Sequence, residues 1–503
     1  MIFQAIFDSL VSLMQPELLV MLFVGTFAGL VFGALPGLSG ITGLALALPF
    51  TFGMNPLGAM LIFAGIISVT PLGGSIPAIL LNTPGTAPSA ATCFDGFPLT
   101  QRGEGSRTIA VSSVCCFIGT LFGVVVLFLL LYMIVPIILL FRAPEMFWLV
   151  VFGIMIISLV VKEAVLKGLA AGGFGILLSL IGFSGVFPSP RFTGGSTFLW
   201  DGVPLVPLYI GLFAISEMIA YTARGGTIAP PEAAQKADWK QMLQGIVDVF
   251  KRPWLVIRSS IIGTVVGITP GVGGAVSAFI AYSWAKQSSK HPETFGKGNI
   301  EGVIAAETAN DAKEGGSLLP TVAFGVPGSA NMAIVLGAFV LHGFEPGPSI
   351  LRDHFDIVSM LAVGISLSQL VGSVLVFFIA PRLARLVTVR TDYLAPVVVI
   401  LCMAGAYSIR ENVWDLFICV LAGCFGYLLK RYGYPVIPIA IGYILGKLAE
   451  ISFHQSLMMS YGSYKIFFSS PICIFLMVCV ALLPLMPYLK AIREKRLAKL
   501  REV

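Results

Sequence analysis

The chain has 503 residues, of which 57% are hydrophobic and only 11% are charged, and its mean hydropathy is +0.94. About a quarter of the residues in a soluble globular protein are charged, so this composition excludes a water-soluble protein. The formal net charge of +6 is small, and the positions of the charges are more informative than their sum.

Apolar runs fill the first part of the chain. No Asp, Glu, Lys, Arg or His occurs between Leu18 and Phe94, and a helix needs about 20 apolar residues to cross a bilayer. Together with the later apolar runs, this pattern predicts roughly ten to fourteen membrane elements. Lipid offers the backbone no hydrogen bonds, and an alternating strand pattern is absent. We therefore expect an all-α polytopic membrane protein.

Two Gly- and Pro-rich motifs interrupt the first apolar run. They are Gly29-Leu-Val-Phe-Gly33-Ala-Leu-Pro36-Gly37-Leu-Ser39-Gly40 and Gly73-Gly74-Ser75, which runs on to Asn82-Thr83-Pro84-Gly85-Thr86. A helix broken inside the bilayer frees backbone N–H and C=O groups, which are tolerated only beside protein or a water-filled cavity. Free N–H groups at the start of a half-helix favour an anion, and free carbonyls favour a cation.

A polar segment at residues 223–258 follows this half. It contains several lysines and arginines, so the positive-inside rule places it in the cytoplasm. Residues 237–250 show apolar side chains at helical spacing. They predict a helix that either lies on the membrane surface or simply connects the two halves.

Both motifs recur in the same order in the second half. The copies are Gly263-Thr-Val-Val-Gly267-Ile-Thr-Pro270-Gly271-Val-Gly-Gly274 and Gly315-Gly316-Ser317, which runs on to Gly325-Val-Pro-Gly328-Ser329. This recurrence predicts a duplication, with membrane repeats at 1–222 and 259–489. Basic residues precede only the second copy, so the repeats are predicted to be inverted in the membrane. Further lysines after residue 285 predict that the second broken segment is a re-entrant hairpin.

An acidic segment leads into the second Gly-Gly-Ser motif. Glu307, Asn310, Asp311 and Glu314 recur at the spacing of one helix face, while Lys313 lies off that face. Ionisable groups in a membrane are candidates for proton sites, cation sites or gates. The alternative is a solvated helix on which these residues form only a polar surface.

The broken segments supply two sets of candidate residues, because small polar groups beside free N–H groups can bind a carboxylate without a buried arginine. The substrate-binding candidates are Ser39, Gly73, Gly74, Ser75, Asn82, Thr83, Gly85, Thr86, Gly316, Ser317, Gly328, Ser329 and Asn331. The ion-coupling candidates are Pro36, Gly37, Pro270, Gly271, Glu307, Asn310 and Asp311. The alternative for the glycines and serines is that they only permit close helix packing.

Other features argue against further functions. The 8 cysteines lack metal-ligand spacing, and we expect most of them to be small buried side chains. Nucleotide-binding and hydrolase motifs are absent, so we expect no enzyme, no catalytic residue, no cofactor, and no metal other than a coupling Na⁺.

The first apolar run has no signal-peptide features and is expected to remain in the mature protein. The basic tail at 490–503 is expected in the cytoplasm and without nucleic acid.

The motifs together resemble the large permease subunit of the tripartite tricarboxylate transporters. The resemblance rests on the first and second motifs of both halves and on the segment from Glu307 to Ser317. It implies a bacterial inner-membrane permease that works with a small multi-helix membrane subunit and a periplasmic solute-binding protein. It also implies import of a carboxylate, such as citrate, driven by a Na⁺ or H⁺ gradient rather than by ATP.

The favoured hypothesis is therefore an ion-driven permease in which a tricarboxylate or another organic acid docks at the broken-helix tips. The first alternative is a stand-alone secondary carboxylate transporter, and the second is a solute channel. A channel needs a continuous hydrophilic lining, and the sequence offers one only at the broken segments. A membrane-embedded enzyme needs an ionisable cluster inside a span, for which only the segment from Glu301 to Glu314 is a candidate.

Overall fold

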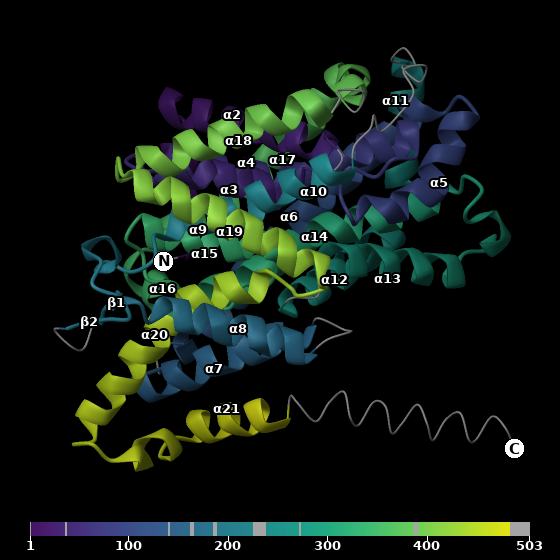
Figure 1. Ribbon diagram of the computed structural model, residues 1–503. Helices are drawn as coiled ribbons and strands as arrows, with labels where there is room; N and C mark the ends of the chain where they lie inside the picture. Colours follow the sequence, from purple (N-terminus) through teal and green to yellow (C-terminus); the bar gives the residue numbers. More distant parts are fainter. Residues whose placement is uncertain are drawn as a thin grey trace, which may run out of the picture. The chain divides into compact units, whose positions relative to one another are not determined.

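The computed structural model describes residues 2–35, 38–138, 141–160, 165–184, 189–224, 238–270, 273–386 and 391–482. Helices form almost all of these ranges (Figure 1), and the only strands within them are a short antiparallel pair, β1 (Gly182–Phe183) and β2 (Pro190–Arg191). Six of the described helices are long and apolar enough to cross a membrane, and eight shorter apolar helices accompany them. The predicted all-α polytopic membrane fold is confirmed.

The chain forms two compact units. The larger comprises Met1–Pro136 and Pro204–Leu428, and the smaller comprises Ile137–Val203 and Leu429–Val503. These units reflect packing and not sequence repetition, so the repeats at 1–222 and 259–489 and the linker at 223–258 stay predictions. The predicted tail at 490–503 and the linker residues 225–237 lie outside the described residues.

The larger unit holds most of the helices, two of which, α6 and α19, run slightly past its bounds. They are α1 (Ile2–Ser12), α2 (Pro16–Ala34), α3 (Gly40–Thr51), α4 (Pro56–Leu81), α5 (Ser89–Gln101), α6 (Gly105–Ile138), α9 (Leu205–Tyr209), the π-helix η2 (Ile210–Ile215), α10 (Ser216–Arg224), α11 (Trp239–Phe250), α12 (Pro253–Ile268), α13 (Gly273–Ser288), the 3₁₀ turn η4 (Pro292–Thr294), α14 (Ile300–Phe324), α15 (Ala330–Leu341), α16 (Pro348–Asp353), α17 (Phe355–Leu386), α18 (Thr391–Ser408) and α19 (Val413–Arg431).

The smaller unit is built around α20, which packs along α7 and α8. An ion pair of 2.8 Å between Arg191 and Glu450 joins β2 to α20. Glycines allow the helices to approach closely, since a Cβ atom at Gly442 would lie 2.2 Å from the carbonyl oxygen of Gly172. Besides the two strands, its elements are α7 (Ala143–Val160), α8 (Val165–Ser179), η1 (Thr197–Leu199), α20 (Ile437–Met459), η5 (Tyr464–Phe468) and α21 (Pro471–Leu482).

Two central helices, α4 and α14, form the core of the larger unit. Nearly every residue of both is buried, as expected for a helix that protein covers on all sides. Each begins after an asparagine whose side chain caps the first turn, Asn55 or Asn299. Each ends at a residue in the left-handed region, Asn82 at φ 55° or Gly325 at φ 68°, and this conformation turns the chain sharply away from the helix axis.

Each central helix is packed against a neighbour in the same way. A Cβ atom at Gly33 of α2 would lie 2.2 Å from the carbonyl oxygen of Thr70 in α4. A Cβ atom at Gly267 of α12 would lie 2.4 Å from the carbonyl oxygen of Lys313 in α14. Backbones come this close only where a glycine removes the side chain. Gly33 and Gly267 are equivalent positions of the repeated motif, and each makes this kind of close backbone contact with a central helix.

The Gly-Gly-Ser motifs do not break their helices, and this corrects the sequence analysis. The motif residues that lie inside α4 or α14 are Gly73, Gly74, Ser75, Gly315, Gly316 and Ser317. Neighbouring backbone occupies the space beside these glycines; a Cβ atom at Gly73 would lie 2.6 Å from the carbonyl oxygen of Leu30. The helices end only at Leu81 and Phe324, a few residues further on.

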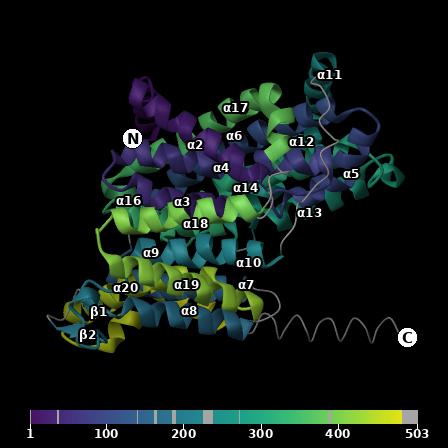
Figure 2. The same ribbon diagram turned by 45° about the horizontal axis from the view of Figure 1, so that its top comes forward.

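Short helical pairs hold the first motif of each half. Helices α12 and α13 contain 16 residues each, so each is about 24 Å long, less than the hydrocarbon core of about 30 Å. They lie side by side (Figures 1 and 2), as the predicted re-entrant hairpin requires. Pro270 lies in the turn after α12, whereas Pro36, Gly37 and Gly271 lie outside the described residues.

Long helices link the two halves of the larger unit. Helix α6 of the first half packs on α14 of the second, because Gly119 and Gly123 expose their backbone to Thr308 and Ala312. Helix α17 of the second half packs on α4 of the first, with Gly372 against Val69. Each central helix is therefore covered by a helix from the other half.

Candidate functional site

A buried carboxylate lies at the meeting point of α4, α5, α6 and α14. Glu307 of α14 is 1% exposed and accepts hydrogen bonds from Ser75 of α4 at 2.8 Å and from Ser112 of α6 at 2.7 Å. The hydroxyl of Thr92 in α5 and the thiol of Cys116 in α6 also donate to it. Four donors from three helices thus surround one carboxylate, which satisfies it in its charged form.

Asp311, one helical turn beyond Glu307, has the opposite environment. Its side chain is fully buried, yet neither carboxylate oxygen has a hydrogen-bond partner among the described residues. One ligand atom each from Asp311, Glu307 and Cys116 lie within 4.8 Å of one another. A buried carboxylate without a donor is costly as an anion, so this position favours a bound proton or a small cation.

The third acidic residue of this helix face forms an ion pair. The ammonium group of Lys313 contacts one oxygen of Glu314, and the second oxygen has no partner among the described residues. Within the described part of the chain, Lys313 is the only lysine or arginine that is buried. All four predicted residues of the acidic face are buried. The alternative of a solvated acidic surface is wrong.

The start of α13 lies against this helix face. A Cβ atom at Gly274 would lie 2.6 Å from the side-chain oxygen of Asn310, 2.4 Å from Cε of Lys313 and 3.1 Å from the ring of Pro88. The Asn310 amide is buried, and neither its oxygen nor its nitrogen has a partner among the described residues. The first turn of α13 therefore lies beside the unpaired Asn310 amide and the stem of Lys313, whose ammonium group is paired with Glu314. The free N–H groups of this helix N-terminus favour an anion.

A related arrangement occurs at the start of α3. A Cβ atom at Gly40 would lie 3.2 Å from the Thr70 side chain and 3.4 Å from the side-chain oxygen of Asn331, at the start of α15. Ser39 precedes α3, with its hydroxyl 3.5 Å from that of Thr42. The starts of α3 and α15 thus meet, as do those of α13 and α5. Each meeting joins one helix from each half of the chain.

The remaining substrate-binding candidates lie along the segments that follow the central helices. After α4, the amide of Gly85 donates to the carbonyl of Gly74 at 3.1 Å, and the hydroxyl of Thr86 lies 2.8 Å from that of Ser89. Asn82 is exposed at the end of α4. The Thr83 hydroxyl is buried without a partner among the described residues.

The equivalent segment after α14 is held by its own side chains. The amide of Gly328 donates to the Thr321 hydroxyl at 3.2 Å, and Ser329 caps α15 through the amide of Met332. Ser317 donates to the carbonyl of Glu314 at 3.0 Å. Residues predicted for the substrate are thus spread over both segments, and their part in substrate binding stays a prediction.

The structure brings residues of the two predicted sets, substrate-binding and ion-coupling, into contact, which the sequence did not predict. Ser75, predicted for the substrate, contacts Glu307, predicted for the ion. Three donors to Glu307 were not predicted at all: Thr92, Ser112 and Cys116. The only available signal was the spacing of Ser112 and Cys116, four residues apart and hence on one helix face.

Comparisons with known proteins identify the family of the chain. A family model described as "Tripartite tricarboxylate transporter TctA family" matches residues 19–441. The Agrobacterium vitis protein "Uncharacterized 52.8 kDa protein in TAR-I ttuC' 3'region" is 32% identical over 500 residues, covering 96% of this chain and 95% of that protein. A second Agrobacterium vitis protein, "Uncharacterized protein in TAR-II ttuC' 3'region", is 33% identical over 241 residues, covering 46% of this chain and 98% of that protein.

No solved structure matches the chain. The family model, however, covers most of the chain, including α4, α14 and the buried acidic face between them. The relative with the longer match is similar over nearly its whole length. The chain is therefore a multi-pass membrane protein that belongs to the tripartite tricarboxylate transporter TctA family.

Proposed function

We propose that this chain is the permease subunit of an ion-driven uptake system for a carboxylate in a bacterial inner membrane. Its family implies the large subunit of a tripartite transporter. A periplasmic binding protein would deliver the solute, and a small multi-helix membrane subunit would complete the assembly. The observation that carries the proposal is the fully buried acidic face of α14, where no hydrogen bond reaches either oxygen of Asp311 from the described residues.

The ion step follows from the contrast between the two acids. Glu307 already has four donors, so its charge is stabilised without an added ion. Asp311 has none among the described residues, so an added H⁺ or Na⁺ removes a large desolvation penalty. Asp311 is therefore the residue that takes up the coupling ion, and Glu307 holds the local charge constant.

The carboxylate step is assigned to the start of α13. There the free N–H groups of the first turn of α13 lie beside the unpaired amide of Asn310 and offer hydrogen bonds and the positive end of the helix dipole to an anion. The ammonium group of Lys313 is close by but is paired with Glu314. Asn310 and Asp311 are adjacent in α14. A cation bound at Asp311 removes negative charge beside this anion site and so strengthens carboxylate binding. By linkage, the carboxylate strengthens ion binding equally, and this mutual effect couples the two movements.

Reconstituted uptake tests the proposal. Proteoliposomes that contain the chain, the small membrane subunit and the binding protein are loaded so that either a Na⁺ or a pH gradient is directed inward. A panel of labelled mono-, di- and tricarboxylates is then offered. We expect accumulation above the external concentration under one of the gradients, and none when the gradient is collapsed with an ionophore.

Two outcomes would contradict the proposal. If no carboxylate in the panel accumulated under either gradient, ion-driven uptake would be refuted. If the chain alone accumulated the carboxylate as fast as the full assembly did, it would be a stand-alone transporter and not one subunit of three.

A further inference from the structure

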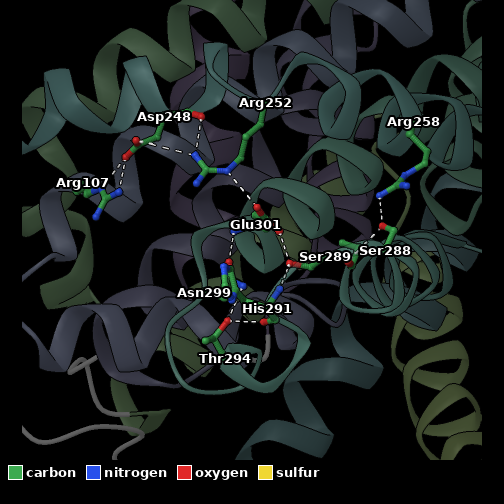
Figure 3. Close-up of polar contacts among 11 residues, drawn as sticks. Arg107, Asp248, Arg252, Arg258, Ser288, Ser289, His291, Thr294, Asn299 and Glu301 are labelled. Carbon is green, nitrogen blue, oxygen red and sulfur yellow. Dashed lines mark hydrogen bonds and ion pairs between the residues drawn. The ribbon is translucent and has the colours of Figure 1, made fainter.

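A pocket of 680 Å³ is lined by residues of α12, of the end of α13 and of the segment that follows it, and none of the acids Glu307, Asp311 and Glu314 lines it. It lies at the end of the hairpin where α11 joins α12, and Figure 3 shows the polar side chains around it. Its lining combines cations, one acid and two indole rings. These residues are Arg252, Trp254, Arg258, Trp284, Lys290 and Glu301.

One of the three cations is already neutralised. Arg252 lies 3.4 Å from Glu301 and 4.0 Å from Asp248, and Asp248 also pairs with Arg107 of α6. Ser289 donates to the second oxygen of Glu301 at 2.8 Å. Figure 3 shows these contacts as one continuous chain. The single carboxylate of the lining is therefore fully engaged.

The other two cations face the pocket without an acid. Arg258 donates to the neutral hydroxyl of Ser288 at 2.6 Å and lies 5.8 Å from the centre of the Trp284 ring. Lys290 forms no ion pair with any described residue. Two unneutralised positive charges and a hydroxyl group thus meet at one rim, which is the donor set that binds a phosphate.

Below this rim the wall becomes apolar. Ile257 and Ile261 line the pocket and are 41% and 48% exposed, and Val265, which is 58% exposed, continues their row along α12 beyond the pocket. Trp254, at the upper end of this row, is 79% exposed. Cations above a long apolar stripe, with indole rings at the boundary, match the headgroup and acyl regions of a bilayer.

Helix α11 extends the same boundary. One of its faces packs on α6, where Gly245 meets the carbonyl of Arg107. The opposite face leaves apolar side chains exposed, namely Trp239, Leu243, Val247 and Phe250. An amphipathic helix with an uncovered apolar face beside basic residues is typical of a membrane interface. This arrangement favours the surface helix over the plain connector.

We propose that this pocket binds one anionic phospholipid of the cytoplasmic leaflet. The lipid phosphate contacts Arg258, Lys290 and Ser288, and an acyl chain lies along Ile257 and Ile261. The lipid is chosen over a free anion because the polar rim continues directly into an apolar wall. The cytoplasmic leaflet is chosen because basic residues concentrate at this end of the hairpin and because anionic lipids attract such residues.

The test is lipid retention by the purified full chain, measured by native mass spectrometry after titration with phosphatidylglycerol or phosphatidylcholine. We expect retention of one phosphatidylglycerol in preference to phosphatidylcholine. Lys290→Gln is expected to weaken phosphatidylglycerol binding about fivefold, because each surface cation near an anionic headgroup contributes about 1 kcal/mol. Arg258→Gln with Lys290→Gln is expected to weaken it by more than tenfold.

Lys286→Gln is the matched control, since it removes the same charge from the same helix end but does not line the pocket. Lys290 is exposed, so its replacement leaves the fold intact, which the elution volume verifies. Equal weakening by Lys286→Gln and Lys290→Gln would refute the pocket. So would equal retention of the two lipids. Competition by inorganic phosphate as effective as that by phosphatidylglycerol would show a free-anion site and overturn the lipid assignment.

Discussion

Two buried aspartates of this chain, Asp95 and Asp311, have opposite surroundings. One oxygen of Asp95 accepts three backbone amides, from Gly296, Gly298 and Asn299, and its other oxygen accepts the Tyr282 hydroxyl at 2.9 Å. Asp311 accepts nothing from the described residues. The first aspartate is therefore stabilised as an anion, and the second is destabilised.

The first prediction is that Asp311→Asn raises the stability of the fold. The substitution keeps the volume of the side chain and removes a carboxyl group whose charge no hydrogen bond from the described residues stabilises and which needs a bound proton or cation, so we expect a gain of about 1 kcal/mol. The measurement is the midpoint of thermal unfolding of the purified chain in detergent. A lower midpoint than that of the native chain would show that the charge of Asp311 is stabilised by contacts that this account does not include.

The second prediction is that the same change at Asp95 has the opposite sign. Asp95→Asn replaces charge-assisted hydrogen bonds with weaker ones and introduces an amide group beside several donors, so we expect a loss of about 2 kcal/mol. Hydrogen exchange should accelerate at residues 296–299, which Asp95 holds. Tyr282→Phe is the control, because it removes only the contact to the second oxygen. Unchanged exchange in Asp95→Asn would contradict the anchoring role.

At the scale of the element, glycines decide how closely the helices pack. A Cβ atom at Gly123 of α6 would lie 2.3 Å from the carbonyl oxygen of Ala312 in α14. Our third prediction is that Gly123→Ala forces these two helices apart and costs about 2 kcal/mol. Gly173→Ala in α8, where nothing lies within 4 Å of the new Cβ atom, should be neutral or stabilise by up to about 1 kcal/mol. Thermal unfolding of both variants distinguishes them, and equal shifts would refute the prediction.

The sequence predicts an element correctly where the residues that define the pattern all lie on one helix. The spacing of Glu307, Asn310, Asp311 and Glu314 correctly places them together on one helix, and the pattern at 237–250 correctly predicts α11. The breaks at the Gly-Gly-Ser motifs were predicted wrongly, because glycine in a membrane helix serves packing as often as it serves a break. The packing partner is invisible in the sequence, so the two roles look the same.

The surroundings of Glu307 could not be predicted for a related reason. Its donors come from α4, α5 and α6, which are separated from it by about 190 to 230 residues of chain and are brought together only by tertiary packing. No local pattern marks a serine that faces a carboxylate rather than its own helix backbone. The sequence therefore does not predict that Thr92 and Ser112 contact Glu307, and it predicts Cys116 only as a small buried side chain.

In the whole molecule, the two central helices differ chemically. Helices α4 and α14 have 26 and 25 residues and share asparagine caps and left-handed ends, but α4 contains no charged residue, whereas α14 contains four acids and one lysine. Helix α4 thus supplies packing and hydroxyl groups, and α14 supplies the ionisable groups. This division of roles is suited to coupling one ion site to one solute site.

If Asp311 couples an ion to carboxylate movement, two kinds of flux in the reconstituted three-component assembly should respond differently to its replacement. Gradient-driven accumulation requires ion coupling, whereas exchange of labelled for unlabelled carboxylate at equal ion concentrations does not. Glu293→Gln is the matched control, because it removes an exposed acid that pairs only with His291 among the described residues.

We predict that Asp311→Asn lowers accumulation by more than tenfold and retains exchange within about threefold of the native rate, since the neutral amide mimics an aspartate that permanently holds its ion. The Glu293→Gln control should match the native chain in both measurements. Native accumulation by Asp311→Asn under the same gradient would contradict the account.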